Sequence, residues 1–150
     1  MALADFRYIM RLTVPYHDID MLQHVNHAAY IVWAETARVG YFQEVVGEHL
    51  AGNNGIILAR LEFDYQRPLS LGDKVAVGCR TLRLGRRSLD LVYEIWNEPS
   101  SSQAAHGLTT LVAYDYEARK SRSIPEPWRE AVVAYETVAP ILRGAAGSRT

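Results

Sequence analysis

The chain has 150 residues, the size of one ordinary domain; 49% are hydrophobic and 22% are charged. This composition excludes a disordered chain, and no apolar run reaches the roughly 18 residues of a membrane-spanning helix. The net charge is -1, so we expect neither nucleic acid nor a membrane as a partner. A single cysteine, Cys79, excludes an internal disulfide, and the N-terminal residues lack a secretion signal, which makes the cytoplasm the expected location.

The first predicted elements are a strand and a long helix. Residues 8–14 alternate between apolar and polar side chains, as in a half-buried strand, and Pro15 ends the pattern. After a polar loop, Asn26 is a candidate N-cap for a helix over 27–46, with Gly47 as its stop. Apolar residues cover more than one stripe of this helix, so we expect it to be central and enclosed.

The second half of the chain predicts a sheet. Four alternating runs follow, at residues 57–65, 75–81, 89–95 and 104–114. Their short connections favour antiparallel pairing, and the phase of the last run places His106 toward the core. A helix is expected over 129–138, and 144–150 read as a frayed tail. The sequence therefore predicts one α+β domain over 1–150, with about five antiparallel strands against one long helix.

The polar loop before the long helix holds the densest group of reactive side chains: Tyr16, His17, Asp18, Asp20, Gln23, His24, Asn26 and His27. The first turn of a helix has unpaired N–H groups and the positive end of the helix dipole, so it can hold a developing oxyanion. An upstream carboxylate can then act as general base or nucleophile. This pattern indicates acyl transfer, although Asp and Asn are also ordinary helix caps.

Residues 18–27, Asp-Ile-Asp-Met-Leu-Gln-His-Val-Asn-His, followed by Tyr30 and a helix containing Trp33, Glu35 and Arg38, resemble the hotdog-fold thioesterases of the 4-hydroxybenzoyl-CoA thioesterase and YbgC type. The segments 63–73 and 112–125 are similar to the same family, and the resemblance runs from about residue 8 to 135. It implies a hotdog fold, in which a curved antiparallel sheet wraps around one long central helix.

The resemblance also implies an activity and a catalytic pair. An acyl-CoA thioesterase hydrolyses an acyl thioester to a carboxylic acid and free coenzyme A, without a metal or redox cofactor. Asp20 would be the base or nucleophile, and the backbone N–H of His27 would face the thioester oxygen. Asn26 and Tyr30 are expected to bind substrate.

Two further expectations concern the nucleotide and the assembly. By resemblance, Arg86 and Arg87 would hold the nucleotide end of coenzyme A, while a second basic cluster at 119–122 is the alternative. Members of the family are dimers or tetramers with sites built across the interface, so a homo-oligomer is expected here.

Several alternatives stay open at this stage. The run 23–26 is more similar to the first repeat of plant acyl-carrier-protein thioesterases, so acyl carrier protein is a second possible substrate carrier. A hydratase and a non-catalytic acyl-CoA-binding module are rival functions. Asp18 is interpreted as a structural acceptor, and Glu35 as a reserve catalyst or an ion-pair partner of Arg38. A metal site could use His17, His24, His27 and Asp20, but their spacing matches no metal motif.

Overall fold

Hydrogen bonding between five long strands builds most of the molecule, and the computed structural model describes residues 2–47 and 54–143. In chain order the elements are β1 (Tyr8–Thr13), α1 (His27–Val46), β2 (Gly55–Tyr65), β3 (Lys74–Leu84), β4 (Ser88–Asn97), β5 (Ser102–Asp115), β6 (Lys120–Ser121), α2 (Glu126–Tyr135) and β7 (Ile141–Leu142). The expected tail at 144–150 lies outside the described residues.

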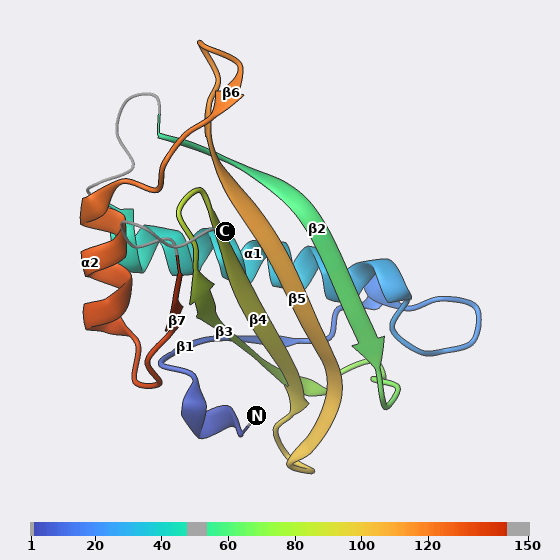
Figure 1. Cartoon of the computed structure of the whole chain (residues 1–150). Coiled ribbons are helices and arrows are strands. Elements are labelled where there is room, and N and C mark those ends of the chain that lie inside the picture. Colours follow the sequence, from blue (N-terminus) through green and yellow to red (C-terminus); the bar gives the residue numbers. More distant parts are fainter. Residues whose placement is uncertain (1, 48–53, 144–150) are drawn as a thin grey trace.

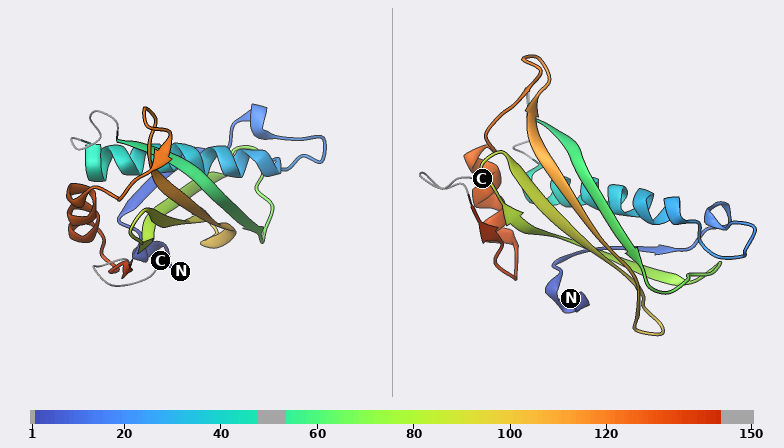
Figure 2. Two further views of the ribbon diagram at one scale, coloured as in Figure 1. Left: turned by 45° about the horizontal axis from the view of Figure 1, so that its top comes forward. Right: turned by 45° about the vertical axis from the view of Figure 1, so that its right-hand side comes forward.

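The strands form one sheet in the order β1-β3-β4-β5-β2, and every neighbouring pair in that order is antiparallel. Two short strands that the sequence did not predict complete it, because β6 pairs with β5 and β7 lies parallel to β3. The sheet curves, and α1 lies across its inner face (Figures 1 and 2). This arrangement confirms the α+β hotdog fold.

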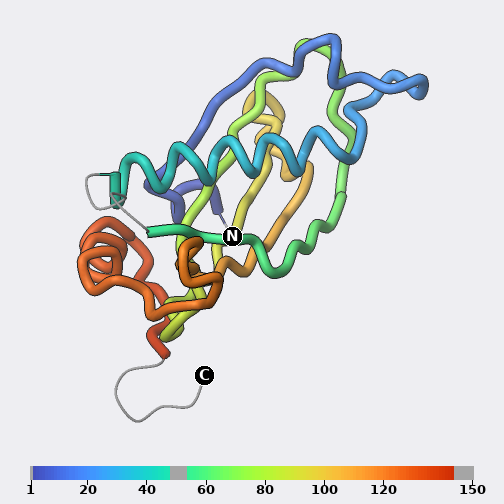
Figure 3. The backbone as a smooth tube through the Cα atoms, turned by 90° about the horizontal axis from the view of Figure 1, so that it is seen from above, coloured from blue at the N-terminus to red at the C-terminus, as the bar shows by residue number. Residues whose placement is uncertain are grey.

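The long helix occupies the centre, and its predicted bounds are confirmed. Its N-cap is Asn26, whose side chain accepts a hydrogen bond from the Ala29 N–H at 2.9 Å. The buried side chains of α1 are Ala29, Tyr30, Trp33, Ala34, Ala37, Tyr41, Phe42 and Val46. These buried side chains occupy more than half of the circumference of the helix. The reason is that β1 and β3 cover one side of α1 and α2 covers another (Figure 3). The thiol of Cys79, on β3 beneath this helix, is fully buried.

The inner face of the sheet carries a different set of β5 residues from the one predicted. The residues paired with the core face of β4 are Ala105, Gly107, Thr109 and Leu111, so His106 points to the outer face and was wrongly assigned to the core. There its Nδ1 lies 2.7 Å from Oε1 of the buried Glu94. Gly107 is required because a Cβ there would overlap the Phe63 ring on β2.

The second helix begins and ends about three residues earlier than predicted. Two prolines stabilise its first turn, with Pro125 at the N-cap and Pro127 inside the helix. It ends at Tyr135, and the C-cap residue Glu136 has a buried carboxylate that accepts hydrogen bonds from the Tyr41 hydroxyl at 2.6 Å and the Thr81 N–H at 2.9 Å. The end of α2 is thereby fixed to α1 and β3.

Neither helix among the described residues has the length and apolar composition needed to cross a bilayer.

Candidate functional site

The loop before α1, here called the Asp20 loop (residues 18–26), folds back on itself. The Asp18 carbonyl accepts hydrogen bonds from both the backbone N–H of Asn26, at 2.9 Å, and its side-chain amide, at 3.0 Å. One step further in, the Asp20 N–H donates to the His24 carbonyl at 2.9 Å. Gln23 closes the turn with a positive φ of 64°. These bonds hold both ends of the loop at the start of the helix.

A buried tryptophan attaches the Asp20 loop to the helix. Nε1 of Trp33 donates to Oδ2 of Asp18 at 3.1 Å, and the Trp33 side chain is only 6% exposed. Asp18 is therefore a hydrogen-bond acceptor that fixes the loop, which agrees with its predicted structural role.

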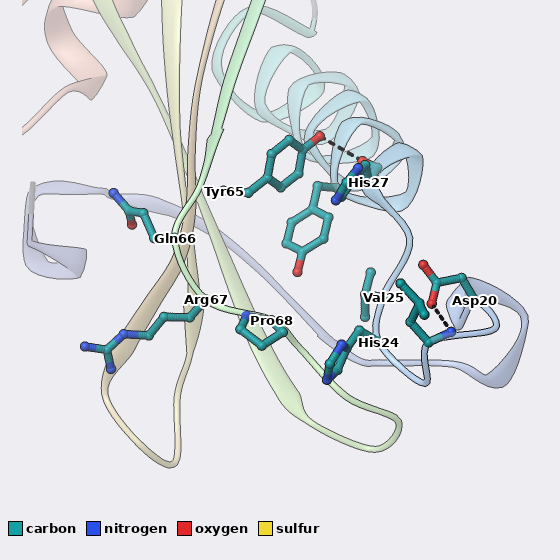
Figure 4. Close-up of a pocket in the computed structure, with 10 residues that line it drawn as sticks. Asp20, His24, Val25, His27, Tyr65, Gln66, Arg67 and Pro68 are labelled. Carbon is teal, nitrogen blue, oxygen red and sulfur yellow. Dashed lines mark hydrogen bonds between the residues drawn. The ribbon is translucent and has the colours of Figure 1, made fainter.

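Asp20 lies on the open side of this loop. Its Oδ1 accepts a hydrogen bond from the Leu22 N–H at 2.9 Å, which orients the carboxylate (Figure 4). The side chain is exposed, and no described residue binds the other oxygen. The carboxylate can therefore accept a proton or attack an electrophile.

The start of α1 supplies hydrogen-bond donors beside this carboxylate. His27 is the first helical residue, and its backbone N–H forms no hydrogen bond with any residue that the structure describes. Because Asn26 caps the N–H of Ala29, the N–H groups of His27 and Ala28 remain for a ligand. A free N–H at the positive end of a helix can stabilise an oxyanion.

The carboxylate and the helix start open on one pocket of about 270 Å³. Its lining comes from the Asp20 loop, the first turns of α1 and the segment after β2: Asp20, Leu22, His24, Val25, His27, Tyr30, Tyr65, Gln66, Arg67 and Pro68. Figure 4 shows Tyr65 and His27 on one side of it and Asp20 on another. Asp20 and His27 therefore line the same cavity.

Tyr65 holds the helix start in place from β2. Its hydroxyl donates to the His27 carbonyl at 2.9 Å, and its ring lies 4.8 Å from the His27 ring and 5.1 Å from that of Tyr30. Burial raises the pKa of both Tyr65 and Tyr30, so both remain neutral phenols. Sequence reasoning missed Tyr65, although the segment through Pro68 was noted as family-like.

The structure brings some of the predicted residues together and leaves others apart. Asp20, His27 and Tyr30 all line the pocket. Asn26 lies directly behind it with its side-chain amide bonded inside the protein, so its substrate-binding role stays a prediction.

Arg86 and Arg87 lie at the opposite end of the sheet. They form the exposed β3–β4 turn beside Ala113, whereas Tyr65 pairs with Ala105. That stretch of strand spans about 26 Å. Within one chain these arginines do not approach the pocket.

The contacts of Arg38 contradict another expectation. The predicted Glu35–Arg38 ion pair does not form, since the guanidinium of Arg38 donates instead to the Tyr93 hydroxyl at 3.4 Å. Among the described residues no three His, Cys, Asp or Glu side chains lie close enough together to hold a metal ion.

Comparison with known proteins places these features in a family. The family profile of the thioesterase-like superfamily matches residues 14–132. The long-chain acyl-CoA thioesterase FadM of Escherichia coli (strain K12) is 28% identical over 121 residues, which cover 77% of this chain and 88% of FadM.

Solved structures of thioesterases have a similar fold. A thioesterase from Thermus thermophilus, crystallised with coenzyme A and Zn, is 35% identical, with a TM-score of 0.79 over 91% of this chain and 98% of that one. A 1,4-dihydroxy-2-naphthoyl-CoA thioesterase, Slr0204 from Synechocystis, shares the fold at 19% identity, with a TM-score of 0.74 over 83% of this chain and 94% of its own.

Proposed function

Because the chain belongs to the thioesterase-like superfamily and is a thioester hydrolase, we propose that it hydrolyses acyl-CoA, with Asp20 as the catalytic carboxylate and the His27 N–H as the oxyanion donor. The observation that carries this proposal is the opening of a free carboxylate and a free helix N–H on the same pocket. FadM, an acyl-CoA thioesterase, and the coenzyme A complex of the Thermus enzyme support coenzyme A as the carrier.

The reaction follows from the positions of these groups. The thioester oxygen binds at the His27 N–H, where a donor of this kind lowers the barrier by about 2.7 to 4 kcal/mol. Asp20 removes a proton from water, the hydroxide oxygen bonds to the carbonyl carbon, and the C–S bond breaks. The proton passes to the leaving thiolate. If Asp20 attacks directly instead, a mixed anhydride forms and water cleaves it in a second step.

A homo-oligomer is part of this proposal, and the edge of the sheet supports it. β2 is an 11-residue strand at the end of the sheet, with no partner on its outer side among the described strands. Its inner face is apolar yet exposed, at 46% for Leu58, 37% for Leu61 and 42% for Tyr65. Long exposed edges of this kind are normally covered by another chain.

Antiparallel pairing of two copies along β2 also gives the distant arginines a role. A two-fold axis reverses the direction of the second β2, so the β3–β4 turn of one copy lies toward the pocket of the other. Arg86 and Arg87 would then bind the nucleotide phosphates of a coenzyme A whose thioester lies in the partner's pocket.

The test is release of free thiol from a panel of acyl-CoAs by the wild type and by Asp20→Asn. We expect the variant to lose about 10²- to 10⁴-fold in turnover while remaining folded, because the amide cannot act as a base. Glu130→Gln, an exposed substitution on α2 away from the pocket and from β2, is the control and should keep full activity. A fully active Asp20→Asn enzyme would overturn the mechanism, and turnover of acyl carrier protein thioesters alone would reassign the carrier.

A further inference from the structure

Arg38 is a half-buried cation without an acidic partner. It lies at the start of the fourth turn of α1, and no carboxylate among the described residues forms an ion pair with it. Its one hydrogen bond, to the Tyr93 hydroxyl, is long at 3.4 Å. A charge that is partly removed from water is costly unless another group compensates it. The protein retains this cost at a position where an uncharged side chain could pack.

Two aromatic rings connect Arg38 to the inner face of β2. Tyr93 belongs to the inner face of the sheet, where its hydroxyl lies 2.8 Å from that of Thr109. The Tyr93 ring stacks on Phe63 of β2, with the ring centroids 6.4 Å apart. Phe63 shares its face with Leu61 and Tyr65, which form the exposed apolar surface described above. Arg38 is therefore linked, through Tyr93 and Phe63, to an apolar surface that continues to the pocket at Tyr65.

The distance along α1 between Arg38 and His27 determines which part of an acyl chain could reach the guanidinium. It follows His27 by eleven residues on the same helix, which corresponds to about 16 Å along the axis. Side chains on a helix tilt toward its N-terminus, so the guanidinium lies nearer the pocket than its own Cα. An acyl chain with its carbonyl at His27 and its body on the inner face of β2 passes within reach of this group.

Resting on the proposed acyl-CoA hydrolysis, we propose that Arg38 is a specificity residue that donates hydrogen bonds to an oxygen of the acyl group, and so selects acyl chains that carry a carbonyl, hydroxyl or carboxylate beyond the thioester. A guanidinium presents several N–H donors and no acceptor, which suits such an oxygen. The apolar face of β2 binds the hydrocarbon portion.

The experiment compares three acyl-CoAs of equal chain length: one unsubstituted, one with an internal oxo or hydroxyl group, and one with a terminal carboxylate. In Arg38→Met we expect kcat/KM to fall about tenfold to a hundredfold for the preferred oxygenated compound, since hydrogen bonds to charged groups are strong. The unsubstituted compound should change less than about threefold. Arg38→Lys should recover part of the preference, and Arg11→Met, exposed on β1 at the opposite edge of the sheet, should change nothing.

Folding and assembly are measured on the same variants. Because Arg38 has no acidic partner, Arg38→Met should unfold at the same or a higher temperature. An equal loss on all three compounds, a lower unfolding temperature or a changed oligomeric state would overturn the proposal, since each indicates a structural or interface role. Titrating the three compounds into Asp20→Asn measures their affinities without turnover, and so separates the Arg38 proposal from the proposed reaction. If Asp20→Asn binds the oxygenated compound more tightly than the unsubstituted one, and the double variant with Arg38→Met does not, the Arg38 proposal is supported even if the wild type releases no thiol.

Discussion

Trp33 connects the Asp20 loop to the helix through one side-chain hydrogen bond. The acceptor is Asp18, two residues before Asp20, the proposed catalytic carboxylate, and Trp33 itself does not line the pocket. The bonds from Asn26 to the Asp18 carbonyl hold the backbone of the loop, and the Trp33 bond adds a side-chain contact to them. Without this contact the loop can move slightly against the helix start, and a displacement of about 1 Å can cost about a hundredfold in rate. Trp33 is in this sense a positioning residue.

Trp33→Phe removes the N–H and keeps most of the ring. We expect kcat to fall about tenfold to a hundredfold, with KM within about twofold, because the loop loses its orientation and the pocket remains. Asp18→Ala should have a similar effect, and the double variant should be no worse than either, which a double-mutant cycle on kcat measures. Trp128→Phe, equally buried but packed on Phe42 away from the pocket, is the control. Additive losses would show that Trp33 and Asp18 act independently.

At the scale of elements, the junction between α2 and the core depends on a buried acid. Burial is the main cause that raises the pKa of Glu136, while its hydrogen bonds to Tyr41 and Thr81 oppose the rise. The second oxygen, Oε2, is buried without a hydrogen bond. Since folding raises this pKa, the native state binds more protons than the unfolded chain, and the free energy of unfolding contributed by this group decreases as pH increases.

Glu136→Gln should therefore change the pH profile of stability. The amide oxygen can still accept from Tyr41 and Thr81 but cannot ionise, so the variant should lack the part of the decline that begins near the ordinary pKa of 4.5 and ends at the raised one. The difference in unfolding free energy between variant and wild type, measured by urea titration across this window, should increase with pH. Glu130→Gln on the exposed side of α2 is the control. A difference that does not vary with pH would contradict the assignment.

The sequence predicted the long elements well and their faces less well. The bounds of α1 follow from Asn26 and Gly47, which are local signals. The inner faces of β2 and β5 do not follow from periodicity, because a bulge between Leu58 and Arg60 shifts the phase of β2 and small residues face inward on β5. The short strands β6 and β7 have only two residues each, too few for a periodic signal, and β7 depends on pairing with the distant β3.

The site was predictable where the chemistry is local. Asp20 and His27, whose proposed roles come from the family resemblance, lie seven residues apart in one loop and helix start, and both line the pocket. Tyr65 reaches the same pocket from a strand 38 residues further along, and only the folded chain reveals this contact.

At the scale of the whole molecule, the proposed dimer predicts that each site combines residues from two chains. Coexpression of Asp20→Asn with the double variant Arg86→Glu and Arg87→Glu should produce mixed dimers in which one site has both its carboxylate and its arginines intact. We expect thiol release from the mixture to exceed that of either variant alone. Activity equal to the average of the two separate variants would place Arg86 and Arg87 outside the partner's site.

The position of Cys79 has a practical consequence for work on this protein. It is the only cysteine in the sequence, its side chain is fully buried, and burial raises the pKa of its thiol. Thiol-reactive reagents therefore have no accessible target in the native fold. A dye that reports free thiol counts product without background from the enzyme, and any cysteine introduced on the surface becomes the sole attachment point for a label.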